Sequence, residues 1–184
     1  MRFRTEQAVP GPRDAVVAAF VDPDYYAGLD GLPTVGRPEV LDHRRKGRTV
    51  LLEVRYLFTG QLAPAARRIL DPAKLTWVNR IELDLDRGEA TLEMLPDHYP
   101  NRLSCRGSFR FEAEGAGTRE ILEGDLIVHF LLVGRTVEKA LVGGLGRHLA
   151  EEAPRLGAFA TAAGSPKAAP DKRRAPAKKP ARKP

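Results

Sequence analysis

The 184-residue sequence predicts an α+β fold, in which a curved antiparallel sheet of about seven strands grips one long C-terminal helix. Three observations predict it. Six segments alternate apolar and polar residues with a period of two, which is typical of strands with one buried face, and a polar seventh segment, residues 37–46, is expected to be an edge strand. Two short segments after the first strand carry helix-start signals. The last apolar pattern changes to a period of about four, which is typical of an amphipathic helix.

An N-terminal strand and two short helices open the chain. The strand is expected over residues 2–9, where apolar and charged side chains alternate. Pro12 then suits the first turn of a helix, where no backbone N–H group is needed. Asp22 can cap a second short helix that begins with Pro23.

Six further strand patterns follow the two helices. They are expected over residues 37–46, 48–58, 74–85, 88–95, 102–112 and 118–131. Short turns between most of them favour a meander of antiparallel neighbours. Residues 59–73 are expected to form a loop with a short helical turn.

The last element is an amphipathic helix over residues 135 to about 152. Its apolar residues recur every four positions, as Val137, Leu141, Leu145 and Leu149. Pro154 is expected to kink or end it, because proline lacks the N–H donor and clashes with the preceding turn. This helix is the only large amphipathic element available to cover the sheet, and a curved sheet around it leaves room for a cavity.

Charge divides the chain into a domain over residues 1–160 and a tail over residues 161–184. From Gly164 onward the net charge is +7, whereas the rest of the chain has a net charge of −1. The tail contains five prolines after Gly164 and no aromatic residue, so we expect it to be disordered. Its cations are expected to attract nucleic acid or an anionic surface without sequence preference. The tail has eight cations, Lys167 and the seven assigned to this role: Lys172, Arg173, Arg174, Lys178, Lys179, Arg182 and Lys183.

The order of elements resembles a known superfamily over roughly residues 1–160. The landmarks are MRFRTEQAV, PRDAVVAAFVDPDYYAGL, KLTWVNRIEL and GDLIVHFLLVGRTVEKALVGGLGRHLAEE. They resemble the START-like superfamily, also called the helix-grip or SRPBCC fold, and an uncharacterised actinobacterial family within it. The resemblance implies an internal cavity for an apolar or amphipathic small molecule. Some relatives are lipid or hormone carriers, and others are polyketide cyclases or aromatases.

The expected ligand site lies on the apolar face of the sheet and on the helix that covers it. Its residues are Tyr56, Trp77, Asn79, Met94, Phe109, Leu126, Val128, Leu141, Gly144 and Leu145. The apolar members could equally be plain core. Asn79 is a polar side chain on an apolar face, so it is either satisfied by a neighbour or anchors a ligand. Three helix glycines, at positions 143, 144 and 146, leave room for either a close approach to the sheet or a ligand.

The sequence predicts no cofactor, no metal and no catalytic residue. It lacks phosphate-loop, HExxH and Gly-x-Ser-x-Gly motifs. His148 and Glu152 lie one helical turn apart, but two ligands are too few for a metal site. The single cysteine, Cys105, is expected to be a buried, inert thiol. A signal peptide and an apolar stretch of membrane-spanning length are both missing, so we expect a cytoplasmic protein without a transmembrane segment.

Three hypotheses for the function follow. The first is binding of a hydrophobic small molecule without chemistry of its own. The second is a cyclase-like or hydrolytic enzyme, which needs an acid or base inside the cavity. Its candidates are His98, Glu123, Asp125 and Tyr56. The third is association with a polyanion through the basic tail.

Overall fold

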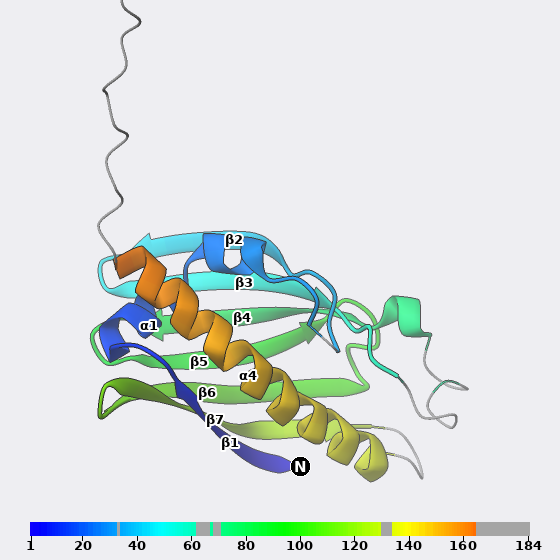
Figure 1. Cartoon of the computed structure of the whole chain (residues 1–184). Helices are drawn as coiled ribbons and strands as arrows, with labels where there is room; N and C mark the ends of the chain where they lie inside the picture. Colours follow the sequence, from blue (N-terminus) through cyan, green and yellow to red (C-terminus); the bar gives the residue numbers. More distant parts are fainter. Residues whose placement is uncertain (33, 62–66, 68–70, 130–133, 165–184) are drawn as a thin grey trace, which may run out of the picture.

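The computed structural model describes residues 1–32, 34–61, 67, 71–129 and 134–164. Its strands are β1 (Arg2–Val9), β2 (Glu39–Lys46), β3 (Thr49–Leu57), β4 (Thr76–Asp84), β5 (Glu89–Pro96), β6 (Leu103–Glu114) and β7 (Gly117–Val128). Its helices are α1 (Arg13–Phe20), α2 (Pro23–Gly28), the short 3₁₀ helix η1 (Pro72–Lys74) and α4 (Gly134–Gly164). The predicted fold class is confirmed, with short helices after the first strand and a long helix at the end (Figure 1).

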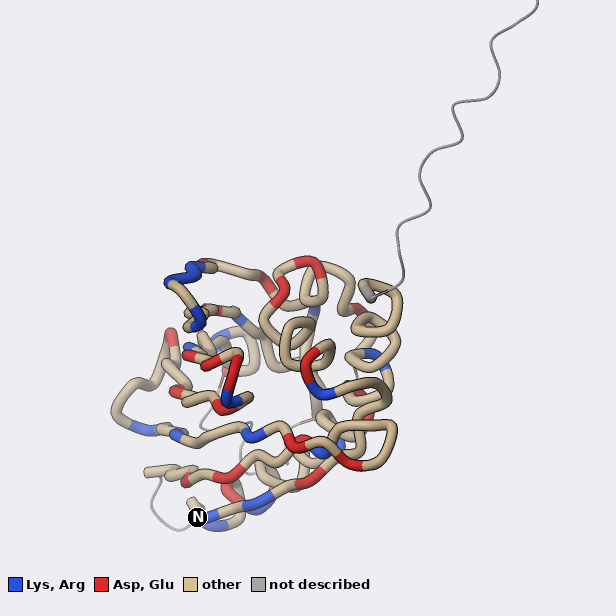
Figure 2. The backbone as a smooth tube through the Cα atoms, turned by 90° about the vertical axis from the view of Figure 1, so that its left-hand side faces the viewer, with Lys and Arg blue, Asp and Glu red and all other residues tan. Residues whose placement is uncertain are grey.

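The seven strands form one sheet in the order β1-β7-β6-β5-β4-β3-β2, with every described pair antiparallel. Strands β2 to β7 make the predicted meander. Helices α1 and α2 carry the chain from β1 at one edge to β2 at the other. Viewed along the strands, the sheet is strongly curved, with the helices on its concave side (Figure 2). This curvature brings strands far apart in the sheet to face the same helix.

The concave face of the sheet, called here the inner face, is apolar. Its register is fixed by cross-strand pairs, for example Leu52 with Ile81 and Ile81 with Leu92. Gly107 and Gly124 face each other farther along the same row. A Cβ atom at either position would come within 2.5 Å of a backbone carbonyl oxygen of the neighbouring strand. These glycines therefore allow the close approach of β6 and β7.

The outer face of the sheet carries charged side chains in cross-strand pairs. Arg80 Nε lies 2.7 Å from Glu53 Oε1, and Arg106 Nη2 lies 2.8 Å from Glu93 Oε1. Exposed pairs of this kind contribute only about 0–1 kcal/mol each. The alternation of such charges with buried apolar residues still fixes the register, since a one-residue slip would bury the charges.

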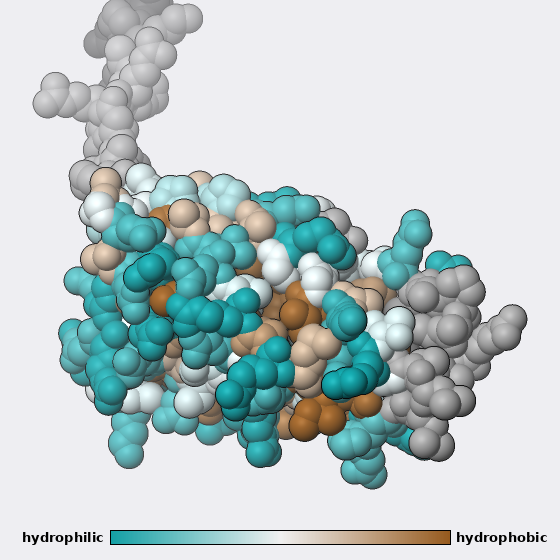
Figure 3. All heavy atoms as spheres, turned by 90° about the horizontal axis from the view of Figure 1, so that it is seen from below, coloured by the Kyte–Doolittle hydropathy of each residue, from teal (hydrophilic) through white to brown (hydrophobic). Residues whose placement is uncertain are grey.

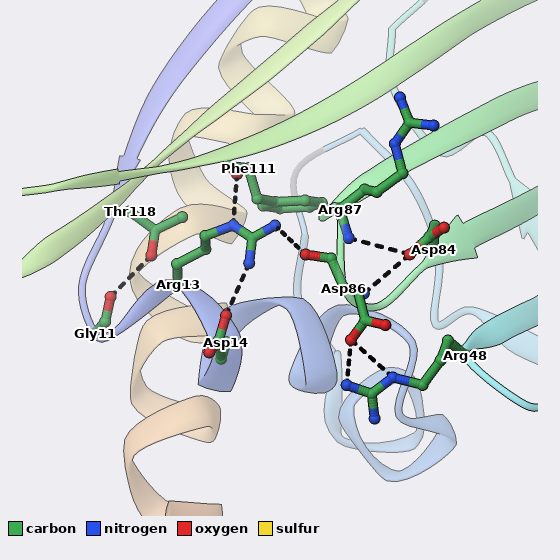
Figure 4. Close-up of polar contacts among 9 residues, drawn as sticks. All are labelled: Gly11, Arg13, Asp14, Arg48, Asp84, Asp86, Arg87, Phe111 and Thr118. Carbon is green, nitrogen blue, oxygen red and sulfur yellow. Dashed lines mark hydrogen bonds and ion pairs between the residues drawn. The ribbon is translucent and has the colours of Figure 1, made fainter.

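The two short helices are held by local hydrogen bonds. Asp22 caps α2 as predicted, because its side chain accepts the N–H of Asp24 at 2.9 Å. Arg13, the first residue of α1, reaches across to the sheet (Figure 4). Its guanidinium donates to the carbonyl oxygens of Phe111 and Asp86, both at 3.0 Å. The Asp86 side chain in turn accepts from Arg48 Nε at 2.7 Å, so α1 is tied to the strand ends.

Helix α4 is longer than the sequence predicted. The expectation that Pro154 would kink or end the helix near residue 152 is wrong about its end, because α4 continues to Gly164. The turn after Pro154 is held by packing, since Leu156 and Ala160 are buried. A Cβ atom on Gly157 would lie 2.4 Å from the Pro10 carbonyl oxygen, so the helix backbone sits directly on the turn between β1 and α1. The tail residues 165–184 lie outside the described residues.

We predict that Gly157→Ala destabilises the protein by about 1–3 kcal/mol, because the added methyl group collides with Pro10. The collision must outweigh the gain of about 1 kcal/mol that alanine brings to a helix. Gly143→Ala is the control, since its added Cβ meets only the end of Arg147 at 3.8 Å and should be neutral or stabilising. Urea unfolding of both variants checks this. Equal free energies of unfolding for the two would contradict it.

Candidate ligand site

The ten residues of the predicted site lie on the inner face of the sheet and on α4. Seven lie on strands, and the register puts all seven on the inner face: Tyr56, Trp77, Asn79, Met94, Phe109, Leu126 and Val128. The other three, Leu141, Gly144 and Leu145, lie on the first half of α4. The fold therefore brings them to one region, and their role in binding a ligand stays a prediction.

The first half of α4 packs less tightly than the second. Leu149, Ala153 and Leu156 in the second half are buried, whereas Leu141 and Leu145 are only half-buried. A Cβ atom on Gly144 would meet no atom within 4 Å. The glycines in this half thus do not mark a tight approach to the sheet, which occurs at Gly157 instead.

Part of the inner face is uncovered as well. Trp77, Asn79 and Met94 point toward the helix side but are only half-buried. Helix α4 packs mainly against α1, β1 and β7, so β4 and β5 lie to one side of it. In the view from below, apolar side chains reach the surface between polar ones (Figure 3). On the inner face, the partly exposed surface of Trp77 and Met94 is apolar surface that a ligand could bury.

Four polar atoms in this layer have no hydrogen-bond partner among the described residues. They are Thr5 Oγ1, Trp77 Nε1, Asn79 Oδ1 and His148 Nδ1, all inaccessible to solvent. An unpaired buried polar atom costs about 1–3 kcal/mol. No described residue satisfies the oxygen of Asn79, which favours its predicted role as an anchor.

A group of hydrogen-bonded titratable side chains joins α2 to α4. The Tyr25 hydroxyl donates to Glu152 Oε1 at 3.0 Å, and His148 Nε2 lies 3.2 Å from Glu152 Oε2. The two α4 residues noted in the sequence therefore pair with each other. Among the described residues, no group of three or more His, Cys, Asp or Glu side chains is placed to hold a metal ion.

Glu120 is the functional candidate that the sequence analysis missed. It lies on the inner face of β7, opposite Phe111 on β6 and Gln7 on β1, and is only 3% exposed. None of the described residues forms a hydrogen bond or ion pair with its carboxyl group. Burial raises its pKa to about 8, and the nearby charge of Glu152 acts in the same direction. The sequence signal for Glu120 was its position two residues before Leu122, which places both side chains on the same face of the strand.

The buried phenols and the thiol stay protonated at neutral pH. Burial, and then the charge of Glu152, raise the pKa of Tyr25 and of Tyr56 well above the ordinary value for tyrosine. The Cys105 thiol is buried as predicted, and burial raises its pKa to about 11. The tyrosines can therefore act as hydrogen-bond donors, whereas Cys105 is a poor nucleophile.

Only one of the four acid–base candidates from the sequence points inward. Tyr56 is buried on the inner face and stacks on Trp77, with ring centroids 5.7 Å apart. Glu123 and Asp125 lie on the outer face, where they pair with arginines of β1. His98 is exposed. The inward acid–base groups are thus Tyr56 and three residues that were not on that list, Glu120, His148 and Glu152.

The described surface also has two shallow hollows on the outer face of the sheet. One is lined by Arg87, Glu89 and Arg110 among others, and the second by Arg4, Arg106 and others. Both are rich in charged side chains that already pair with one another. None of the ten predicted site residues except Phe109 lines them.

The fold gives the class of this protein, and a match to a family model gives its family. A curved seven-stranded antiparallel sheet that grips a C-terminal helix is the helix-grip fold. The chain belongs to DUF2505, a family described as "Protein of unknown function", whose family model matches residues 4–156. No curated protein matches the chain. None of the described helices is long and apolar enough to cross a membrane.

Solved structures share the fold at low sequence identity. The aromatase/cyclase Zhui from Streptomyces sp. R1128 is 17% identical, with a TM-score of 0.62 over 89% of this chain and 98% of that chain. The protein TTHA0849 from Thermus thermophilus is 19% identical, with a TM-score of 0.61 over 90% of this chain and 100% of that chain. The protein Ara h 8.0201 is 11% identical, with a TM-score of 0.54 over 88% and 98%.

We predict that Glu120 makes stability fall as pH rises. The folded protein holds this proton more tightly than the unfolded chain, so the cost of ionisation is absent below about pH 4.5 and complete above about pH 8. The cost corresponds to at most about 5 kcal/mol. Glu120→Gln removes it, so the variant should gain stability over the wild type as pH rises through this window.

Denaturant unfolding of wild type and Glu120→Gln across this pH range measures the difference. Glu123→Gln is the matched control, because Glu123 lies on the outer face of the same strand and is paired with Arg4. A constant difference between Glu120→Gln and wild type at all pH values would show that Glu120 titrates normally.

Proposed function

We propose that the protein binds an apolar or amphipathic small molecule between the inner face of the sheet and the first half of α4. The observation that carries the proposal is the uncovered inner face around Trp77, Asn79 and Met94, where half-buried apolar surface lies beside buried polar atoms without partners. Burying such apolar surface under a ligand is favourable at about 25 cal/mol per Å².

The stacked pair of Tyr56 and Trp77 supplies the aromatic part of this site. Their ring planes are inclined by 15° and the ring faces belong to neighbouring strands. Flat aromatic surfaces of this kind suit planar or alicyclic ligands. The unpartnered Trp77 Nε1 donates and Asn79 Oδ1 accepts, so the pair can orient a ligand that carries both a carbonyl and a hydroxyl or amino group.

An enzyme that uses the same site is the alternative. Two observations favour it: Tyr56 points inward, and Glu120 is a buried carboxyl group whose pKa is raised to about 8. A neutral carboxylic acid in an apolar site can act as a general acid near neutral pH. The similar structure of an aromatase/cyclase, at 17% identity, supports the fold and not the reaction.

We predict that Gly144→Leu weakens the binding of Nile red, a neutral lipophilic dye, by about tenfold or more. The leucine side chain would project into the open space beside Gly144 and occupy the ligand's volume. Gly143→Leu is the matched control, since Gly143 is the adjacent residue and is exposed. Fluorescence titration of the full chain measures both dissociation constants. Equal affinities for the two variants would contradict the proposed location.

Polyanion association through the tail is a separate proposal, compatible with the first. It is supported by the net charge of +7 that follows Gly164. The expected cytoplasmic location would give this segment access to nucleic acid.

We predict that the full chain is retained on immobilised double-stranded DNA and that a chain ending at Ala163 is not, because the remaining residues carry a net charge of −1. If all eight cations contact phosphates, the logarithm of the binding constant should fall against the logarithm of the salt concentration with a slope of about −7. Equal retention of both chains would dismiss the tail as a tether.

A further inference from the structure

The two outer strands of the sheet differ in how their free edges are protected. A strand at the edge of a sheet exposes unpaired N–H and C=O groups, which pair with another strand unless the edge is blocked. Strand β2 is blocked, because its register shifts between Val40 and Asp42, exposed basic side chains follow at residues 43–46, and α2 packs against it. Charges of one sign and an irregular register both oppose the addition of a strand.

The free edge of β1 has none of these protections. Its register with β7 runs without a shift from Arg2 to Val9, and the strand contains no lysine and no proline. No described element lies beyond β1 in the sheet (Figure 1). This edge is therefore open to another strand along its whole length.

The ladder between β1 and β7 shows which backbone groups of β1 are free. The N–H of Leu126 donates to the carbonyl oxygen of Met1 at 2.9 Å, so these two residues form a hydrogen-bonded pair. Hydrogen-bonded and non-hydrogen-bonded pairs alternate in an antiparallel ladder. The even-numbered residues of β1 therefore direct their N–H and C=O groups away from β7. They are Arg2, Arg4, Glu6 and Ala8, and all four are exposed.

We propose that β1 pairs in antiparallel orientation with β1 of a second copy of this chain, about a two-fold axis at Thr5. In this register Arg4 of each copy lies opposite Glu6 of the other. Within one copy Arg4 Nε already donates to Glu6 Oε1 at 2.8 Å, so the pairing joins two ion pairs into a cluster of four alternating charges. The same surface is used on both copies, as in other two-fold dimers.

The charges on β1 select this register. An axis at residue 4 would place Arg4 opposite Arg4, and an axis at residue 6 would place Glu6 opposite Glu6. Like charges directly opposite each other are destabilising. An axis between two residues would set the inner face of one copy against the outer face of the other. Of these registers, only the one centred on Thr5 pairs opposite charges and also brings the free backbone groups of the two strands together.

The helix above β1 leaves room for the second copy. A Cβ atom on Gly146 would lie 3.8 Å from Thr5 Cγ2, so this turn of α4 lies above the proposed axis. Gly143, Gly146 and Ala150 share one side of α4 by their helical spacing. A Cβ atom on Gly143 would meet only Arg147 among the described residues, also at 3.8 Å. Because two helices approach most closely where their side chains are small, these residues fit the passage of the two α4 helices beside each other.

Thr5 gains a partner in the same arrangement. Its Oγ1 atom is buried and has no hydrogen-bond partner among the described residues. The pair at the axis is a non-hydrogen-bonded one, in which the Cα atoms are only about 4.5 Å apart and the side chains are closest. Threonines that face each other across strands form hydrogen bonds between their hydroxyl groups. The proposed dimer therefore offers this hydroxyl group a partner.

The test measures the mass of the full chain by sedimentation velocity from about 1 to about 500 μM, a range that suits a small interface. The wild type is expected to move toward twice the monomer mass as its concentration rises. Glu6→Arg should weaken the dimer at least about tenfold, because Arg4 then faces an arginine in both pairs. Unchanged circular dichroism of this variant would show that it remains folded.

A charge swap provides the rescue. The double variant Arg4→Glu/Glu6→Arg restores opposite charges across the axis, so its dissociation constant should return to within about threefold of the wild-type value. Glu82→Arg is the matched control for Glu6→Arg, since Glu82 is an exposed acid on the outer face of β4, away from the edge. It should leave the dimer unchanged.

Cysteine cross-linking tests the register itself. Thr5→Cys places a thiol at the axis in both copies, so oxidation should join the two copies covalently. Ala8→Cys is the control, because Ala8 lies opposite Arg2 of the second copy and the two Ala8 residues are about 20 Å apart. The native thiol of Cys105 is buried and does not compete.

Each result decides the proposal. A wild-type chain that stays monomeric over the whole concentration range overturns it. A dimer that Glu6→Arg leaves unchanged, or that the double variant does not restore, is joined through another surface and overturns it as well. Cross-linking of Ala8→Cys as efficient as that of Thr5→Cys would show that the register is wrong.

Discussion

A single long helix, α4, has to cover an apolar sheet face that is seven strands wide. The rest of the structure depends on this constraint. Helix α4 packs mainly against α1, β1 and β7, and its second half is fixed by direct backbone contact between Gly157 and the turn at Pro10. A helix that is fixed at its second half cannot also contact every strand of a curved sheet. The first half of the helix is therefore half-buried, and the inner face of β4 and β5 lies beside it with Trp77 and Met94 partly exposed.

Glu120 lies in the same layer and destabilises the folded protein when its carboxyl group ionises. A carboxyl group that is 3% exposed, beside a second carboxyl group and without a partner among the described residues, is destabilising once it ionises. An apolar residue there would pack against Phe111 without this cost. Perturbed groups of this kind cluster at functional sites, although structural networks also produce them. On the helix side, Tyr25 and His148 are both paired with Glu152, whose charge also raises the pKa of Glu120.

The strands and caps were predictable because their signals are local. Period-two alternation identified six of the seven strands, β2 was expected as a polar edge strand, and Asp22 caps α2 as its position before Pro23 indicated. The end of α4 was not predictable from Pro154, because the turn after it is stabilised by contacts with residues more than a hundred positions away. The predicted site residues lie together, but Glu120 was overlooked because a glutamate in a strand pattern is usually assigned to solvent.

The sequence by itself determined the order of elements, the face of each strand that is buried, and the uneven division of charge between the first 163 residues and those that follow. Each of these depends on neighbours a few positions apart, which alternation, capping and composition record directly. Only the tertiary structure decided where α4 touches the sheet, which polar atoms of the described residues lie buried without partners, and that Tyr25, His148 and Glu152 meet. Those features arise from the curvature of the sheet, which brings distant strands and helices to one place and leaves no trace in the local pattern.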